Sequence, residues 1–224
     1  MSIRKYGLLT IILWFFAFTS SITFYWLGIF QSGNQPINAL TAVYLGMALV
    51  LIALYLFQRK QGAPLEFEKK PMHWVLLVAI GFLSIWGALF LQLIVNSIES
   101  AISGELTVSE NTQNLVTLIK SAPIFLLATA VGGPIMEEFV FRRAIPGIIA
   151  SFPFRFTNFW VGAVISSIIF AFAHSDGHLA VYFFLGMFFC FLFKKTGSIW
   201  TPIIAHAGMN ALVLFAQILL QNLT

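Results

Sequence analysis

The sequence predicts an all-α, polytopic bundle of transmembrane helices, and three features of its composition support this class. Of the 224 residues, 59% are hydrophobic and only 9% are charged, whereas an ordinary soluble domain is about 25% charged. The mean hydropathy is +0.92. The apolar residues also fall into runs of roughly 20, the length that an α-helix needs to cross a bilayer core about 30 Å thick. We expect seven spans, with eight as the alternative.

The polar connectors set the limits of the spans. The segment 58–71 is polar and contains helix-breaking prolines, and 96–114 is the longest polar stretch of the chain. The expected spans, in order, are Tyr6–Phe30, Ile37–Phe57, His73–Val95, Pro123–Ile149, Phe159–His174, Leu179–Phe193 and Ser198–Leu220. We divide this integral-membrane unit into N-terminal helices and loops, 1–114, and a C-terminal core, 121–220.

Basic residues fall at alternate ends of these spans and predict the topology. They are Arg4, Lys5, the basic residues of 59–70, Arg142, Arg143, Arg155, Lys194 and Lys195, with Lys120 as the one exception. Basic loops stay in the cytoplasm, so we expect a cytoplasmic N-terminus. The apolar run after Lys5 is longer than the core of a signal peptide and has no small-residue cleavage site. An uncleaved first helix is therefore expected.

Several functional classes are excluded by missing residues. Cys190 is the single cysteine, so no internal disulfide can form, and Asp176 is the single aspartate, so a two-aspartate intramembrane protease is excluded. Neither HExxH nor GxSxG occurs, which argues against zinc-helix proteases and serine hydrolases with a nucleophile elbow. The basic residues are dispersed in pairs, so we expect no nucleic-acid partner.

The stretch "EEFVFR", residues 137–142, brings charge into an otherwise apolar run. On a helix, Glu138 and Arg142 are i and i+4 with the acid first, the favourable orientation for an ion pair. Glu137 points elsewhere and is left without that cation. One glutamate is then structural and the other free to act. The alternative is that both glutamates simply pair with Arg142 and Arg143 at the cytoplasmic interface.

Two further polar clusters lie on later spans. His174 ends "FAFAH", and His178 follows beside Asp176, where we expect it to be more exposed. In "HAGMN", His206 and Asn210 are i and i+4, and Gly208 between them lets a neighbouring helix approach closely. Taken singly, each cluster can be explained by interfacial anchoring or helix–helix hydrogen bonds.

Three such clusters in one half of the chain favour a single site, because an ionisable group at bilayer depth costs at least about 2.5–3.5 kcal/mol. A free carboxylate, two histidines and an amide are what water-mediated peptide hydrolysis requires: a base for water and donors for the oxyanion. A rise of 1.5 Å per residue places His174 roughly 10 Å deeper than Glu137 and His206, however.

The three motifs fit EExxxR, FxxxH and HxxxN in that order, over about residues 121–220. This ordered set resembles the CAAX protease and bacteriocin-processing family of intramembrane glutamate endopeptidases, which includes the type II CAAX prenyl endopeptidase. The resemblance implies that Glu137 activates water, that His174 positions it, and that His206 and Asn210 form the oxyanion site. Glu138 and Arg142 would be the supporting pair. His178 stands where several relatives have asparagine and is a secondary candidate.

The resemblance implies an intramembrane endopeptidase that cuts a peptide or membrane-associated protein near the cytoplasmic surface, in peptide maturation, bacteriocin immunity or CAAX-type processing. We expect no cofactor; the alternative is zinc on Glu137, His174 and His206. The alternative function is a non-proteolytic scaffold that binds a peptide or a membrane-protein partner through the same polar cluster. The short loops favour a bacterial cytoplasmic membrane.

Overall fold

The computed structural model describes residues 1–28, 35–61, 64–104, 109–174 and 176–223, and these residues form helices and connecting turns without a β-strand. The long helices are α1 (Ile3–Trp26), α2 (Gln35–Gln61), α3 (Trp74–Ser103), α8 (Phe159–His174), α9 (Leu179–Thr196) and α10 (Trp200–Leu223). A short 3₁₀ helix, η1 (Glu66–Lys69), precedes α3, and α4 (Glu110–Ser121) follows it. The predicted all-α bundle is confirmed.

A broken helical run occupies the fourth predicted span. It consists of α5 (Phe125–Leu127), η2 (Ala128–Gly132), α6 (Gly133–Glu137), η3 (Glu138–Ala144) and α7 (Ile145–Ala150), of which η2 and η3 are π-helical. Pro134 and Pro146 lack the backbone N–H that a regular helix requires. π-Helical turns are frequently found at functional sites, and η3 carries most of the charged stretch identified in the sequence.

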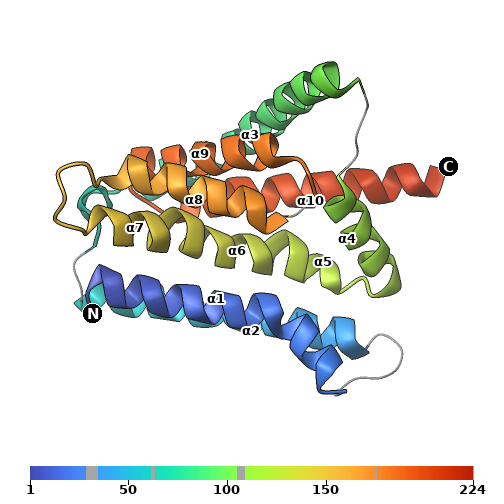
Figure 1. Ribbon diagram of the computed structural model, residues 1–224, viewed down its shortest axis with the longest axis horizontal. Helices are drawn as coiled ribbons and strands as arrows, with labels where there is room; N and C mark the ends of the chain where they lie inside the picture. Colours follow the sequence, from blue (N-terminus) through green and yellow to red (C-terminus); the bar gives the residue numbers. More distant parts are fainter. Residues whose placement is uncertain (29–34, 62–63, 105–108, 175, 224) are drawn as a thin grey trace.

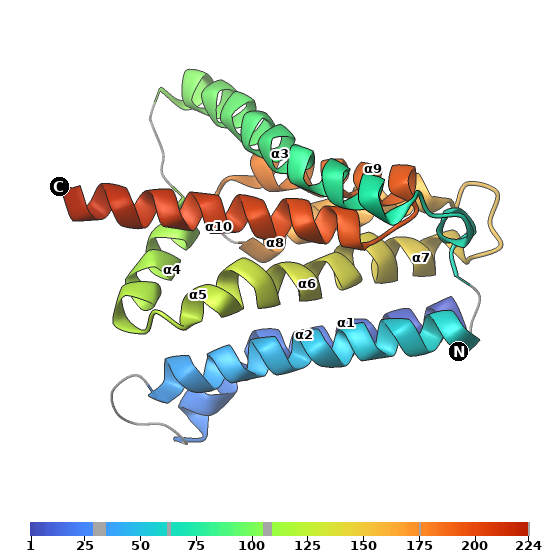
Figure 2. The same ribbon diagram turned by 180° about the vertical axis from the view of Figure 1, so that it is seen from behind.

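This broken run lies in the middle of the molecule (Figure 1). The pair α1 and α2 packs on one side of it, and α8, α9 and α10 pack on the other, with α3 beyond them against α9 and α10. The view from behind shows the same three layers (Figure 2). The polar residues of α6 and η3 are therefore buried between two groups of apolar helices.

The predicted span limits are close to the observed helices, except at the end of the third span. The third helix continues to Ser103 and ends at Gly104, which adopts a positive φ of 75°, so its last turns include residues expected in a polar loop. Among the described residues, five helices are long and apolar enough to cross a membrane: α1, α2, α3, α9 and α10. The apolar helix α8 has 16 residues. The chain is an integral membrane protein.

The close approach predicted at Gly208 is confirmed. A Cβ atom on Gly208 would lie 2.3 Å from Ile85 Cδ1, and a Cβ atom on Gly81 would lie 2.9 Å from Ile204 Cβ. These glycines bring the first half of α3 against α10. Further along, α3 diverges from α10, which can be followed in both views (Figures 1 and 2).

Basic side chains gather at one end of the bundle, here called the basic end. Arg4 bonds to Ser151 after α7, Arg59 bonds to the Glu68 carbonyl, and Lys194 lies over the Trp160 ring. This end holds the starts of α1, α3, α8 and α10 and lies on the left in Figure 1. The end of α3, the start of α4 and the α8–α9 turn lie at the opposite end.

Candidate active site

Glu138 is the centre of a buried polar cluster. Its Oε1 accepts a hydrogen bond from His206 Nδ1 at 2.8 Å, and its Oε2 lies 3.3 Å from Arg142 Nε. The side chains of Glu138 and Arg142 are fully buried. The i, i+4 pair predicted from the sequence is therefore present, although its helix is π-helical. The Arg142 guanidinium also lies 4.3 Å from the Phe170 ring centroid, a cation–π contact.

Glu137 stands apart from this ion pair. Its Oε2 lies 3.7 Å from His206 Nε2, and its side chain is 24% exposed. His206 is thus placed between two carboxylates, with Nδ1 on Glu138 and Nε2 facing Glu137. The ring is held flat against Phe189, with the ring centroids 4.9 Å apart. Glu137 is therefore the carboxylate left outside the ion pair with Arg142, as the sequence indicated.

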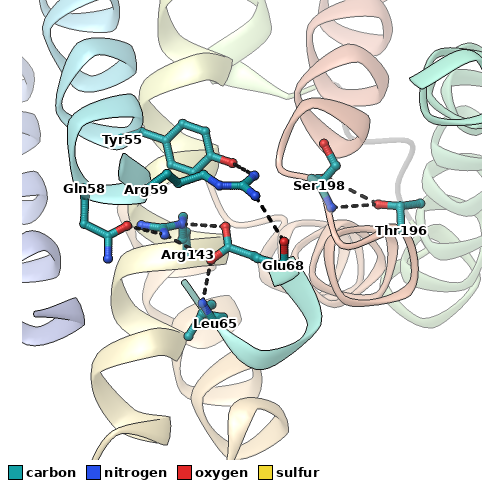
Figure 3. A network of polar contacts seen from close by, with 8 residues as sticks. All are labelled: Tyr55, Gln58, Arg59, Leu65, Glu68, Arg143, Thr196 and Ser198. Atoms are coloured by element: carbon teal, nitrogen blue, oxygen red, sulfur yellow. Dashed lines mark hydrogen bonds and ion pairs between the residues drawn. The ribbon is translucent and has the colours of Figure 1, made fainter. Parts of the chain in front are cut away.

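The alternative in which both glutamates pair with Arg142 and Arg143 is wrong. Arg143 bonds to Glu68, with Nε 2.8 Å from Oε1 and Nη2 3.0 Å from Oε2, and also to the Gln58 side chain at 2.8 Å (Figure 3). Both arginines are fully buried. They were counted among the basic loop residues in the topology prediction, and this was also wrong, because tertiary packing places them inside the bundle.

Glu68 is a buried charged residue that the sequence reading did not single out. It lies in η1, in a connector rich in charged residues, where nothing distinguishes it from the exposed Glu66. Its Oε2 also accepts a hydrogen bond from the Leu65 amide at 2.8 Å. A signal was available in hindsight: Arg143 needed an acid outside its own helix once Glu138 had paired with Arg142.

His174 is oriented by its neighbours on α8 and α9. Its Nδ1 lies 2.8 Å from the Phe170 carbonyl oxygen, so that nitrogen is the donor and Nε2 carries the lone pair. The ring stacks on Tyr182, with the centroids 3.9 Å apart. Glu137 and His206 both lie within electrostatic range of this ring. Nε2 of His174 is therefore an acceptor, and the Glu137 carboxylate lies within electrostatic range of its ring.

A cavity of about 270 Å³ borders the cluster. His174, His206 and Asn210 line the cavity. Glu137 does not line it, but its Oε2 lies 3.7 Å from Nε2 of His206, which does. The structure thus joins three of the predicted site residues around one space and places Glu137 beside it. The lining residues come from α3, α4, α8, α9 and α10, toward the end of the bundle opposite the basic end. This differs from the expected opening toward the basic, cytoplasmic side.

His178 is not exposed, in contrast to the expectation. It is 8% exposed, and its Nδ1 lies 2.9 Å from Glu99 Oε2 near the end of α3. The neighbouring Asp176 accepts hydrogen bonds from Ser109 at 2.6 Å and from the Tyr182 hydroxyl at 2.7 Å. These contacts tie the α8–α9 turn to α3 and α4 at the cavity. His178 therefore holds two helices together at the opening.

The zinc alternative requires Glu137, His174 and His206 to converge on one point. Within the described ranges, no three His, Cys, Asp or Glu side chains gather closely enough to hold a metal ion. His206 Nδ1 bonds to Glu138 and His174 Nδ1 to a carbonyl oxygen, which leaves Nε2 of each ring available, as in a metal-ligating histidine. Zinc is therefore disfavoured by the lack of convergence among the described residues alone, and the absence of a cofactor stays a prediction.

Comparison with known proteins identifies the same region. The family model "Type II CAAX prenyl endopeptidase Rce1-like" matches residues 119–212, which include all three motifs. No solved structure shows significant similarity to the chain.

Two bacterial relatives extend the similarity beyond that region. YdiL of Bacillus subtilis (strain 168), whose name describes a candidate membrane peptidase, is 38% identical over 147 residues, or 62% of this chain and 59% of its own length. The membrane-embedded CAAX protease MroQ of Staphylococcus aureus (strain USA300) is 33% identical over 187 residues, or 79% of this chain and 74% of its own length. With similarity of this extent to MroQ and a family match over every motif, the chain belongs to the Rce1-like family of type II CAAX prenyl endopeptidases.

Proposed function

We propose that this protein is an intramembrane endopeptidase in which Glu137 activates water for the hydrolysis of a peptide bond. The observation that carries the proposal is the unequal environment of the two adjacent glutamates. Glu138 is held by Arg142 and His206, whereas Glu137 is partly exposed, forms no ion pair with an arginine among the described residues, and lies 3.7 Å from His206 Nε2. One carboxylate is occupied as a structural anion, and the other is left as a base.

In the proposed reaction, each side chain has a separate role. Glu137 takes a proton from water as the oxygen attacks the scissile carbonyl carbon, and His174 Nε2 accepts the second hydrogen of that water and positions it. The oxyanion receives hydrogen bonds from His206 Nε2 and the Asn210 amide. Glu137 then returns the proton to the leaving amine, so that the enzyme is regenerated without a covalent intermediate.

For His206 to donate through Nε2, both of its ring nitrogens must carry protons. Glu138 accepts from Nδ1 at 2.8 Å, so it anchors one edge of the ring and sets its direction. Arg142 in turn holds Glu138. In this scheme Glu138 and Arg142 act through His206 and are positioning residues.

The substrate we propose is a peptide or a membrane-associated protein in a bacterial cytoplasmic membrane, with the N-terminus of the enzyme in the cytoplasm. The names of the two relatives, a candidate membrane peptidase and a membrane-embedded CAAX protease, support proteolysis. Peptide maturation, bacteriocin immunity and CAAX-type processing remain the three candidate roles.

The test uses the purified protein in liposomes with a pool of synthetic single-span peptides, and mass spectrometry identifies the products. We expect Glu137→Gln to lower cleavage by about 10²–10⁴-fold, the contribution of a general base. Glu66→Gln is the matched control, since that carboxylate lies exposed on η1 and its ion-pair partner among the described residues is Lys69. Cleavage by Glu137→Gln at the control rate would refute the proposal.

The same samples distinguish the proposed enzyme from a non-proteolytic scaffold. Peptides retained by the Glu137→Gln protein but not cut indicate an enzyme whose binding survives the loss of its base. Peptides bound and left intact by the unaltered protein would instead favour a non-proteolytic scaffold.

A further inference from the structure

The cavity beside His206 lies between α3 and α10 where these two helices diverge. On α10, His206, Asn210 and Gln217 line it and fall on one helical face, with intervals of four and seven residues. On α3, Gln92 and Asn96 line the opposite wall, again four residues apart. Two rows of side-chain amides thus extend from His206 toward the end of the bundle that is opposite the basic end.

Apart from His174, His178 and His206, the side chains that line the cavity are uncharged. None of the residues that line the cavity is Lys, Arg, Asp or Glu. A side-chain amide has both donor hydrogens and an acceptor oxygen, so it can pair with either the N–H or the C=O of a peptide backbone. Gln92 Oε1 is buried without a hydrogen-bond partner in the described part of the protein, and burying such an atom is unfavourable unless a ligand or water satisfies it.

A peptide that is cut inside a membrane has the complementary requirement. Its backbone must be unwound from the helix before water can reach the scissile carbonyl, and in an apolar surrounding every released N–H and C=O group must find a partner. The two rows of amides supply such partners in sequence, leading to the His206 donor. They match an uncharged, unwound peptide segment.

The direction of approach follows from the charges of the whole molecule. Nine of the basic residues lie on or next to the helix ends that form the basic end, and they are Arg4, Lys5, Arg59, Lys60, Lys69, Lys70, Arg155, Lys194 and Lys195. Glu99, Glu110 and Asp176 belong to the opposite end, near the cavity, with Lys120 as the described basic residue there. Because an excess of Lys and Arg marks the cytoplasmic side, the cavity opens away from the cytoplasm.

We propose that the substrate is an uncharged, unwound peptide segment that enters from the non-cytoplasmic end, between α3 and α10, with its backbone hydrogen-bonded by Gln92, Asn96, Asn210 and Gln217. This inference rests on the proposed function for its final step, the cut beside His206. Its access route and its contacts are independent of whether the peptide is cut. It replaces the expectation of a cut near the cytoplasmic surface.

The access route is tested by cysteine labelling in the full-length protein with a membrane-impermeant maleimide, in intact cells and in inside-out vesicles. Val213→Cys places a thiol in the cavity wall, and Leu212→Cys places one on the 40% exposed neighbouring position, which faces lipid. Arg155→Cys reports the basic end. The native Cys190 is buried, so labelling of the unaltered protein gives the background signal.

We expect Val213→Cys to be labelled in intact cells, Arg155→Cys only in inside-out vesicles, and Leu212→Cys in neither. Added peptide pool should protect Val213→Cys in a Glu137→Gln background, where nothing is cut. Labelling of Val213→Cys from the cytoplasmic side only, or from neither side, would overturn the inference even if cleavage is found. If the unaltered protein cleaves no peptide, the proposed function is wrong. The labelling and protection results still decide whether peptides enter from the non-cytoplasmic end.

The amide contacts are tested by a matched pair on α10. Gln217→Leu removes a cavity amide and should raise KM about tenfold with kcat unchanged, the effect of one lost hydrogen bond. Gln221→Leu makes the same replacement one turn further on, at an exposed position, and should leave KM unchanged. Equal KM values for the two variants would remove the amides from the proposal.

Discussion

Arg142 and Arg143 are adjacent, equally buried, and each faces a buried glutamate, yet the two pairs are built differently. The Arg143 guanidinium makes two short bonds to Glu68, a third to Gln58, and lies 4.4 Å from the Tyr6 ring centroid. The Arg142 guanidinium has a single 3.3 Å contact with Glu138, and its nitrogens have no hydrogen-bond partner among the described residues. The Glu138 carboxylate is shared between Arg142 and His206.

The difference separates a structural pair from a pair that belongs to the site. Glu68 accepts two hydrogen bonds from Arg143, which leaves only Nη1 of that guanidinium without a partner among the described residues, and the pair joins η1 to the central helical run (Figure 3). Glu138 divides its two oxygens between a cation and an imidazole and so couples Arg142 to His206. A buried ion pair with unpaired polar atoms is costly, and in the proposed mechanism this cost is offset because Glu138 holds His206 in place.

Replacement of Glu138 tests the site pair most directly. In Glu138→Gln, a neutral amide replaces the carboxylate that accepts from His206 Nδ1, so the ring loses the anion that keeps both of its nitrogens protonated. We expect kcat to fall by roughly 10³–10⁴-fold, as when the acid that orients a catalytic histidine becomes an amide. The rate is measured on the peptide identified in the liposome assay, with circular dichroism to verify that the helices persist. A rate close to that of the unaltered protein would mean that Glu138 does not orient His206.

Replacement of Arg142 should have a smaller effect, because this residue acts through Glu138. We expect Arg142→Met to lower kcat by about 10–100-fold, the usual result of removing the support of a site residue, with KM little changed. Steady-state kinetics separates the two constants. An increase in KM with unchanged kcat would assign Arg142 to substrate binding instead.

Replacements in the Glu68–Arg143 pair should lower the stability of the protein and leave kcat unchanged. Glu68→Gln leaves Arg143 buried beside a neutral partner and should lower the free energy of unfolding by about 3–5 kcal/mol, while the folded fraction keeps its kcat. Thermal unfolding in detergent measures the loss. The double variant Glu68→Met with Arg143→Met should recover most of that stability, because well-packed apolar residues often replace a buried ion pair without cost. Loss of kcat in the double variant would show that Arg143 also serves the reaction.

Exhaustive chelation should have the smallest effect, with no change in the rate of cleavage. The proposed mechanism uses a carboxylate, imidazoles and an amide, and the three zinc candidates do not converge among the described residues. Peptide cleavage is compared before and after dialysis against a chelator, with zinc added back. A rate that falls on chelation and returns with zinc would establish the metal alternative.

Local features were predictable from the sequence because they depend on neighbours along the chain. Long apolar runs determine where helices cross the membrane, and an i, i+4 spacing determines that Glu138, rather than Glu137, meets Arg142. Gly208 likewise marks a close helix contact because the lack of a side chain is a property of that one residue. The positions of His174, His206 and Asn210 around one cavity agree with motif order, while their roles stay predictions.

Tertiary structure alone decided which distant residues meet. Glu138 and His206 are 68 positions apart, and Glu68 and Arg143 are 75 positions apart. His178 pairs with Glu99 across 79 positions, and the residues that line the cavity lie toward the end of the bundle opposite the basic end. Periodicity and spacing describe one helix at a time. Which charge is neutralised by which partner depends on the packing of whole helices, because desolvation penalises every unpaired charge and only the assembled bundle determines which oppositely charged group is within reach.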